Sequence, residues 1–218
     1  MFTHILFDLD GTLTDPALGI TNSVIYALKK LGFRAPERKD LYFFIGPPLL
    51  DSFKSYCNIS DDQAQTAIKY YREYFSDKGV FENKLLEGIP ELLNDLKKSG
   101  KTLAVATSKP LVFAQKILEH FNIAQFFDYA VGSELDGRLT DKSEVIAKTL
   151  KMMGNPDKAN TVMVGDRCFD ITGAQKNRIK SIGILFGYGD RSELLEAGAD
   201  YLAENTKELK KLLTHSVF

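Results

Sequence analysis

Two carboxylates separated by one residue follow the first apolar run of the chain. The run His4–Phe7 continues directly into Asp8, Leu9 and Asp10. Residues i and i+2 of an extended chain point to the same side, so we expect Asp8 and Asp10 to face one pocket. Adjacent carboxylates repel each other and need a cation or a shared proton. The pair therefore indicates acid–base or nucleophilic chemistry at a strand tip, and an acidic turn is the alternative.

Hydroxyl side chains end a second predicted strand. Thr107 closes the apolar run Thr102–Thr107, and Ser108 follows it, just before a predicted helix that opens at Pro110. Unpaired backbone N–H groups and the helix dipole make such a junction favourable for an anion. A simple helix cap would leave the same pattern.

Lys142 lies in the first turn of a further predicted helix. It follows Asp141, which resembles the start of a capping box completed by Glu144. A cation at this position opposes the helix dipole. That cost is reasonable if the ammonium group reaches an anionic group, and a solvated surface lysine is the alternative.

Two more carboxylates follow the predicted strand Thr161–Val164. Asp166 stands just beyond the strand, and Asp170 comes four residues later, which is about one turn if a helix has begun. Together with Asp8 and Asp10, these side chains suit a hard cation that prefers oxygen ligands. The sequence therefore predicts Mg²⁺ as the cofactor.

Short apolar runs alternate with helical patterns along most of the chain. Such runs fit strands that are covered on both faces, and their alternation with helices predicts a doubly wound, mainly parallel α/β sheet. Ligands of such sheets bind at the carboxyl ends of the strands, where the polar residues above lie. The predicted strands are His4–Phe7, Thr102–Thr107, Tyr129–Gly132, Thr161–Val164, Ser181–Leu185 and Tyr201–Ala203.

The stretch 15–86 interrupts this alternation. It holds little strand signal, whereas Ile20–Leu31 and Asp62–Phe75 have the apolar spacing of amphipathic helices. We therefore expect an α-helical domain at 15–86, inserted into an α/β core domain formed by 1–14 and 87–218. An α-rich half of one single domain is the alternative.

The composition argues against several classes of protein. The 28 basic and 29 acidic side chains nearly cancel, so nothing favours a nucleic-acid polymer as a partner. Two cysteines cannot build a disulfide framework, the first residues lack the basic start of a signal peptide, and no apolar run is long enough to span a membrane. We expect a cytoplasmic protein, a monomer or a homodimer, that acts on a small molecule.

Taken in order, these motifs resemble those of the haloacid dehalogenase (HAD) superfamily of hydrolases, which use an aspartate as nucleophile. The resemblance spans nearly the whole chain. It implies a Rossmann-like core with a helical cap domain inserted after the first motif, which matches the stretch 15–86. The motifs that carry it are Asp8-Leu9-Asp10-Gly11-Thr12, Thr107-Ser108, Lys142, and Gly165-Asp166 with Asp170.

The resemblance implies a phosphatase that works through an aspartyl-phosphate. Asp8 would be the nucleophile. Asp10 would protonate the leaving oxygen and then activate the water that releases phosphate. Thr107 and the backbone N–H of Ser108 would bind phosphoryl oxygens, and Lys142 would neutralise the charge of the nucleophile and the phosphoryl group.

The resemblance also implies a metal site and leaves alternatives for the activity. Mg²⁺ would be held by Asp8, the Asp10 carbonyl and Asp166, with Asp170 orienting these ligands. True dehalogenases of the superfamily have no acid at the place of Asp10, whereas phosphomutases share it. The continuation Gly11-Thr12-Leu13 looks more like the phosphatases than the mutases. A signalling module that is merely phosphorylated is a further alternative.

Three stretches resemble the branch that contains 5′-nucleotidases and phosphoglycolate phosphatases, namely 44–53, 136–139 and 187–189. The resemblance therefore implies a small phosphorylated metabolite as substrate. Tyr188, Phe44 or Phe53 could stack on a base, with core packing as the alternative. Lys54 and Arg72 could receive a second anionic group, with a surface position as the alternative.

Overall fold

The computed structural model describes residues 1–34 and 36–214, and the chain divides into two compact units. The first unit comprises Met1–Thr14 and the chain from Leu85 onward, and the second is Asp15–Lys84. The second change of unit lies two residues before the predicted boundary at 86. Leu86 already belongs to the first unit because its N–H donates to the carbonyl of Leu13 at 3.1 Å.

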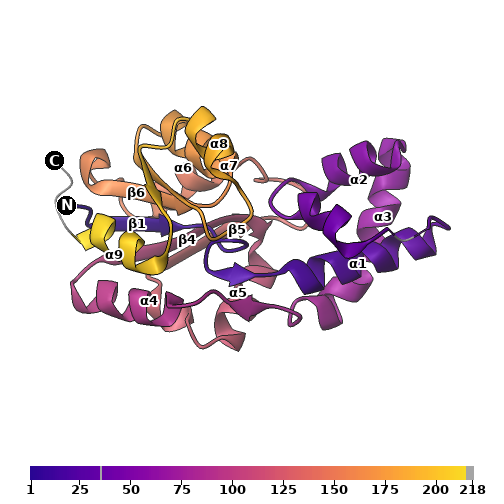
Figure 1. The fold of residues 1–218 in the computed structure, drawn as a ribbon, viewed down its shortest axis with the longest axis horizontal. Helices are drawn as coiled ribbons and strands as arrows, with labels where there is room; N and C mark the ends of the chain where they lie inside the picture. The colour runs from indigo at the N-terminus through magenta and orange to yellow at the C-terminus, as the bar shows by residue number, and fades with distance from the viewer. Residues whose placement is uncertain (35, 215–218) are drawn as a thin grey trace. The chain divides into compact units, whose positions relative to one another are not determined.

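Six strands of the described chain form a parallel sheet in the first unit, in the order β5-β4-β1-β6-β7-β8 (Figure 1). The register pairs His4 with Thr102 on one side and with Thr161 on the other, so that the carboxyl ends of β1, β4 and β6 lie next to one another. The sheet confirms the predicted fold class. Its strands are β1 (His4–Phe7), β4 (Thr102–Pro110), β5 (Tyr129–Ser133), β6 (Thr161–Gly165), β7 (Lys180–Ile184) and β8 (Tyr201–Ala203).

Helices cover both faces of this sheet, with α6, α7 and α8 on one side and α4, α5 and α9 on the other in Figure 1. The central strands are therefore apolar on both faces, and every residue of β6 is buried. The helix α6 begins at Lys142 because the carboxylate of Asp141 accepts the N–H of Ser143 at 2.7 Å. The helices are α4 (Ile89–Lys98), α5 (Leu111–His120), α6 (Lys142–Met152), α7 (Cys168–Lys176), α8 (Arg191–Glu196) and α9 (Thr206–Thr214).

The two-residue strands β2 (Thr14–Asp15) and β3 (Lys84–Leu85) pair with each other where the chain changes unit, and the elements described between them are helical. Helix α1 packs closely against η2, since a Cβ atom at Gly19 would lie 1.9 Å from the carbonyl oxygen of Gly79. The stretch 45–48, which holds a glycine and two prolines, separates η1 from α2. The helical elements are α1 (Ala17–Lys30), η1 (Arg38–Phe44), α2 (Leu49–Cys57), α3 (Asp61–Tyr74) and η2 (Phe75–Gly79).

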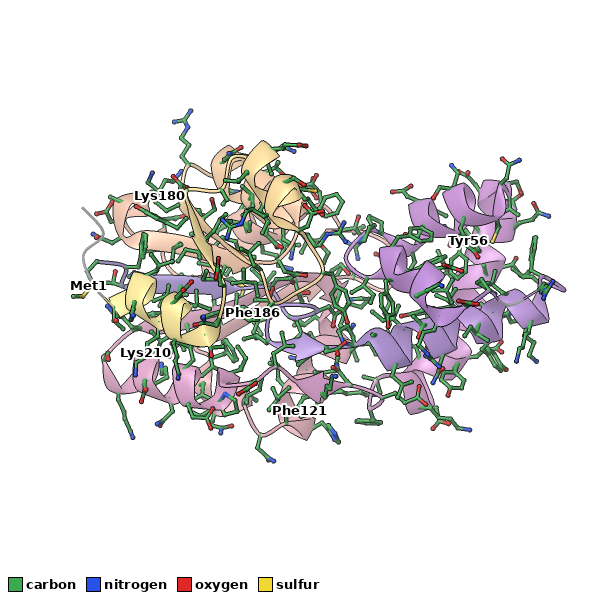
Figure 2. The ribbon with its side chains drawn as sticks, in the orientation of Figure 1. Met1, Tyr56, Phe121, Lys180, Phe186 and Lys210 are labelled. Atoms are coloured by element: carbon green, nitrogen blue, oxygen red, sulfur yellow. The ribbon has the colours of Figure 1, made fainter. Side chains whose placement is uncertain are left out.

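Aromatic side chains fill the core of this unit and reach its surface. Phe53 of α2 is fully buried and meets Phe44 edge to face, with 5.0 Å between the ring centroids. Tyr56, labelled in Figure 2, lies one turn further along α2 and is 37% exposed. Within the residues that the structure describes, no helix of either unit has the length and apolarity needed to cross a membrane.

Candidate active site

Side chains from five segments of the first unit converge at the carboxyl edge of its sheet. Asp8 and Asp166 directly follow β1 and β6, Thr107 lies in the carboxyl-terminal half of β4, and all three are buried. Lys142 and Asp170 come from the first turns of α6 and α7 and are also buried. The parallel register brings these segments together because it aligns the strand ends.

Three of the carboxylates form a tight cluster. Asp8, Asp166 and Asp170 each offer one oxygen, and these oxygens all lie within 4.8 Å of one another. Like charges at this separation, buried from water, destabilise the ionised forms unless a cation balances them. Asp170, expected only to orient the metal ligands, thus stands beside Asp8 and Asp166. Asp10 is not one of these three, and its Oδ2 pairs with Lys109 instead.

The pKa values of these acids reflect the crowding. Burial, together with the charges of Asp170 and Asp8, raises the pKa of Asp166 to about 8. The hydroxyl of Thr12 donates to Asp166 Oδ1 at 3.0 Å and the N–H of Tyr188 donates to Oδ2 at 2.8 Å, and both bonds oppose the rise in pKa. Burial likewise raises the pKa of Asp170 above its ordinary value. Without a cation the ionised cluster is therefore strained.

Lys142 partly relieves this strain. Its Nζ lies 2.8 Å from Asp8 Oδ1 and 3.0 Å from Asp170 Oδ1, and it donates to the carbonyl of Ala106 at 3.2 Å. Burial alone would lower the pKa of Lys142, but Asp170 and Asp8 together raise it above its ordinary value. The ammonium group therefore stays charged in the interior and reaches anionic partners, as its place in the first helical turn suggested.

Glycines allow the backbone to close around Asp166. Gly11 has a φ of +83°, and a Cβ atom there would lie 2.2 Å from Asp166 Oδ2. A Cβ atom at Gly187 would lie 2.3 Å from the Cβ of Asp166, and one at Gly189 would lie 2.0 Å from its carbonyl oxygen. The loop at 187–189, which the sequence analysis associated only with a branch of the superfamily, thus positions a carboxylate of the cluster. Two glycines flanking a tyrosine were the available signal.

Thr107 and Ser108 lie inside β4, which continues to Pro110, three residues beyond the strand end that the sequence predicted. Thr107 is buried, and its Oγ1 accepts the N–H of Lys109 at 3.2 Å, which leaves the hydroxyl proton available to a phosphoryl oxygen. Ser108 is fixed through its carbonyl, which accepts a hydrogen bond from Ser133 Oγ at 2.8 Å. Helix α5 begins at Leu111, directly after the end of the strand. Both residues thus lie within a few residues of a helix N-terminus, a position that favours an anion.

Lys109 is a site residue that the sequence analysis did not single out. Its ammonium group forms a hydrogen-bonded ion pair with Asp10 Oδ2. The side chains of Lys109 and Asp10 are only 6% and 12% exposed. A lysine in a strand-to-helix junction usually reads as a solvated cation, so the sequence carried little signal for this pair.

The residues considered for substrate recognition have other roles in the structure. Phe44 and Phe53 are buried in the core of the helical unit, so neither ring is available to stack on a base. Lys54 forms an exposed ion pair with Asp61 at 2.6 Å. Tyr188 holds Asp166 through its backbone N–H. For Phe44 and Phe53, core packing is the correct interpretation.

The donor set fits a divalent cation. Apart from their contacts with Lys142, Asp8 Oδ1 and Asp170 Oδ1 are buried and accept no hydrogen bond from the residues that the structure describes. When Asp8, Asp10, Asp166, Asp170 and the two lysines Lys109 and Lys142 are all ionised, the site has two more negative than positive charges. A divalent cation would neutralise this excess, and carboxylate oxygens are the ligands that hard cations prefer.

Comparisons with known proteins agree with the fold. The sequence model of the family described as "Haloacid dehalogenase-like hydrolase" matches residues 5–184. The protein named "5'-nucleotidase" from Pseudomonas aeruginosa is 43% identical over 212 residues, which are 97% of this chain and 96% of that protein. The protein named "Tyrosine-protein kinase PtkA" from Mycobacterium tuberculosis is 40% identical over 185 residues, 85% of this chain and 62% of that protein.

Solved structures give the same result. The crystal structure of a predicted phosphatase from Clostridium acetobutylicum superimposes with a TM-score of 0.93 at 48% sequence identity, covering 97% of both chains. The family match spans most of the chain, including β1, β4 and β6, whose ends carry the buried carboxylates and Thr107. The chain therefore belongs to the haloacid dehalogenase-like hydrolase family.

Proposed function

We propose that the protein is a Mg²⁺-dependent phosphatase that hydrolyses phosphomonoesters of small metabolites through an aspartyl-phosphate on Asp8. The observation that carries the proposal is the pairing of Asp8 with Lys142 at 2.8 Å inside a cluster of buried carboxylates, in a chain of this family. A carboxylate paired with a buried ammonium at this distance is held in one orientation. Asp8 is thereby suited to attack phosphorus.

Two carboxylates divide the covalent chemistry. Asp8 attacks phosphorus while the ester bond breaks, and Asp10 gives its proton to the departing oxygen. Burial raises the pKa of Asp10, which favours the protonated form that this step needs, although Lys109 opposes the rise. Asp10 then takes a proton from the water that attacks the phosphoaspartate.

The remaining residues bind charge. The Thr107 hydroxyl and the Ser108 N–H lie at the junction before α5 and would hold phosphoryl oxygens. Lys142 neutralises the nucleophile and would neutralise the phosphoryl group as well. Mg²⁺ would be held by Asp8 and Asp166, with the Asp10 carbonyl and Asp170 beside them, and when bound it supplies positive charge that polarises the phosphoryl oxygens.

For the substrate we propose a nucleoside 5′-monophosphate, with phosphoglycolate as the second candidate, rather than a nucleic-acid polymer or a membrane lipid. The relative named "5'-nucleotidase" supports the first choice because it aligns along nearly its whole length. The near balance of acidic and basic side chains supports a small substrate over a polymer.

The test is a phosphate-release screen over nucleoside monophosphates, phosphoglycolate and sugar phosphates, with and without Mg²⁺. Asp8→Asn should abolish turnover while leaving the fold intact by circular dichroism, because an amide cannot act as the nucleophile. The matched control is Asp95→Asn, which removes a partly exposed carboxylate paired with Lys210 and should keep full activity. Hydrolysis retained by Asp8→Asn would contradict the mechanism.

The same screen separates the other activities considered for this fold. A phosphomutase, or a kinase such as the name of the mycobacterial relative implies for that protein, passes the phosphoryl group to another hydroxyl and releases little phosphate. A signalling module would hold a lasting phosphoaspartate without turnover. Either outcome, measured with labelled substrate, would replace hydrolysis as the function.

A further inference from the structure

We propose that Lys109 is a positioning residue that holds one oxygen of Asp10 so that the other oxygen exchanges the proton of the reaction. The inference rests on the proposed function. Lys109 Nζ is bonded to Asp10 Oδ2. The second oxygen, Asp10 Oδ1, is buried and accepts no hydrogen bond from any residue that the structure describes. Such a bare buried oxygen is costly unless something else, here the leaving oxygen or the attacking water, meets it.

The backbone that carries Lys109 is itself fixed by the neighbouring strand. The ladder between β4 and β5 is irregular between Ala106 and Pro110. Ser133 of β5 donates to the carbonyl of Ser108 at 2.8 Å. A Cβ atom at Gly132 would lie 2.6 Å from the carbonyl oxygen of Lys109, so only glycine lets β5 approach this closely. The backbone that carries the ammonium group is therefore held in place by β5, as a positioning role requires.

Lys142 does not hold the Asp10 carboxylate in place. Its ammonium group contacts Asp8 and Asp170, and its pull on Asp10 is only electrostatic. Without Lys109, that pull would draw the Asp10 carboxylate toward the other acids and their cation and away from the leaving oxygen. The two lysines thus keep the side chains of Asp8 and Asp10 in separate orientations, although only one residue separates the two aspartates in the sequence.

The two halves of the reaction depend differently on this orientation. In the first half, a bond forms between an Asp8 oxygen and phosphorus, the ester P–O bond breaks, and the proton of Asp10 Oδ1 goes to the leaving oxygen. In the second, a water oxygen bonds to phosphorus, the Asp8–P bond breaks, and a water proton goes to Asp10 Oδ1. An alkyl ester needs Asp10 in both halves. An aryl ester such as p-nitrophenyl phosphate needs it only in the second, because its phenolate leaves without a proton.

The experiment compares Lys109→Met with the wild type in rapid-mixing assays with p-nitrophenyl phosphate and with a nucleoside monophosphate, both with Mg²⁺. We expect Lys109→Met to release a burst of about one p-nitrophenolate per enzyme and then to turn over about 10²-fold more slowly than the wild type, as expected for a misplaced acid–base group. The nucleotide should show the same loss in kcat without a burst and with little change in KM. Lys109→Arg, which keeps the charge, should recover part of the rate.

Two further variants separate positioning from folding. Gly132→Ala keeps the ammonium group but displaces the backbone of Lys109, whose carbonyl oxygen the added Cβ atom would meet. It should give the same burst with a smaller loss of turnover. Lys180→Met removes an exposed lysine paired with Asp200 and should leave both assays unchanged. Urea midpoints of all variants establish how much of each sample is folded, and Lys109→Arg and Gly132→Ala carry the test if Lys109→Met does not fold.

The outcomes are distinct. A burst followed by slow turnover in Lys109→Met or Gly132→Ala supports the inference. Unchanged turnover in the folded variants, or a burst and a steady-state rate that fall together in proportion to the folded fraction, overturns it. A wild type that releases no phosphate overturns the proposed function instead, before Lys109 is tested.

Discussion

Removing divalent cations should make the stability of this protein fall as the pH rises from 6 to 8. The reason is Asp166, which is fully buried and whose pKa is raised to about 8 from an ordinary value of 3.8. Between these two values the folded chain binds one proton more than the unfolded chain. Because stability rises with pH only where the unfolded state binds more protons, the sign here is negative. The slope is about 1.4 kcal/mol per pH unit, so the loss between pH 6 and 8 is roughly 2 kcal/mol.

Magnesium should weaken this dependence of stability on pH. The cation binds the ionised carboxylates, so below pH 8 it must displace the proton of Asp166. Its apparent affinity should therefore rise by up to about tenfold per pH unit, and a concentration of about one hundred times the Kd stabilises the fold by roughly 2.7 kcal/mol. The stabilisation by Mg²⁺ is expected to be greater at pH 8 than at pH 6.

Urea unfolding measured by circular dichroism, with EDTA or with Mg²⁺ at pH 6, 7 and 8, gives the required free energies of unfolding. Asp166→Asn is the control, because it removes the titrating group and should flatten most of the pH dependence in EDTA. Equal free energies at pH 6 and pH 8 in EDTA would refute the assignment of a cation-requiring cluster around Asp166. So would a Mg²⁺ effect that is the same size at both pH values.

Two other variants test the site and the helical unit. Thr12→Val removes the hydroxyl that donates to Asp166 Oδ1 at 3.0 Å. The Mg²⁺ concentration for half-maximal activity, measured by the rate of phosphate release at increasing Mg²⁺, should rise about tenfold. An unchanged Mg²⁺ requirement would show that this hydrogen bond does not orient the carboxylate. Phe53→Ala should lower the free energy of unfolding, measured in urea, by about 3–5 kcal/mol because Phe53 is fully buried. Tyr56→Ala, at a half-exposed position of the same helix, should lower it distinctly less. Equal losses would contradict the described packing.

The sheet could be predicted from the sequence because its strands are covered on both faces. Such strands are continuous apolar runs, and β1 and β8 have the bounds that the sequence predicted. The carboxyl ends of these runs then had to meet, and Asp8, Asp166 and Lys142 do lie together there. The fold class and the convergence of these residues were predictable because both follow from short-range patterns and one topological rule.

The features that escaped prediction depend on contacts between segments far apart in sequence. The two-residue strands β2 and β3 are too short to leave a pattern and exist because they pair with each other. Lys109 looks like a surface cation, and only its place beside Asp10, with β5 packed against its backbone, buries it. A phenylalanine can either stack on a base or fill a core, so the sequence does not distinguish the two roles for Phe53. The packing of the helical unit decides between them.

The spacing of Asp8 and Asp10 led to the expectation that both carboxylates serve one pocket, and the structure adds how they are kept distinct. A nucleophile must remain ionised, whereas an acid must hold a proton until the leaving oxygen takes it. Asp8 pairs with Lys142 among the clustered carboxylate oxygens, whereas Asp10 pairs with Lys109 of the neighbouring strand β4. In the mechanism that we propose, these two lysines from different segments keep the nucleophile apart from the acid, and neither spacing nor composition contains that division.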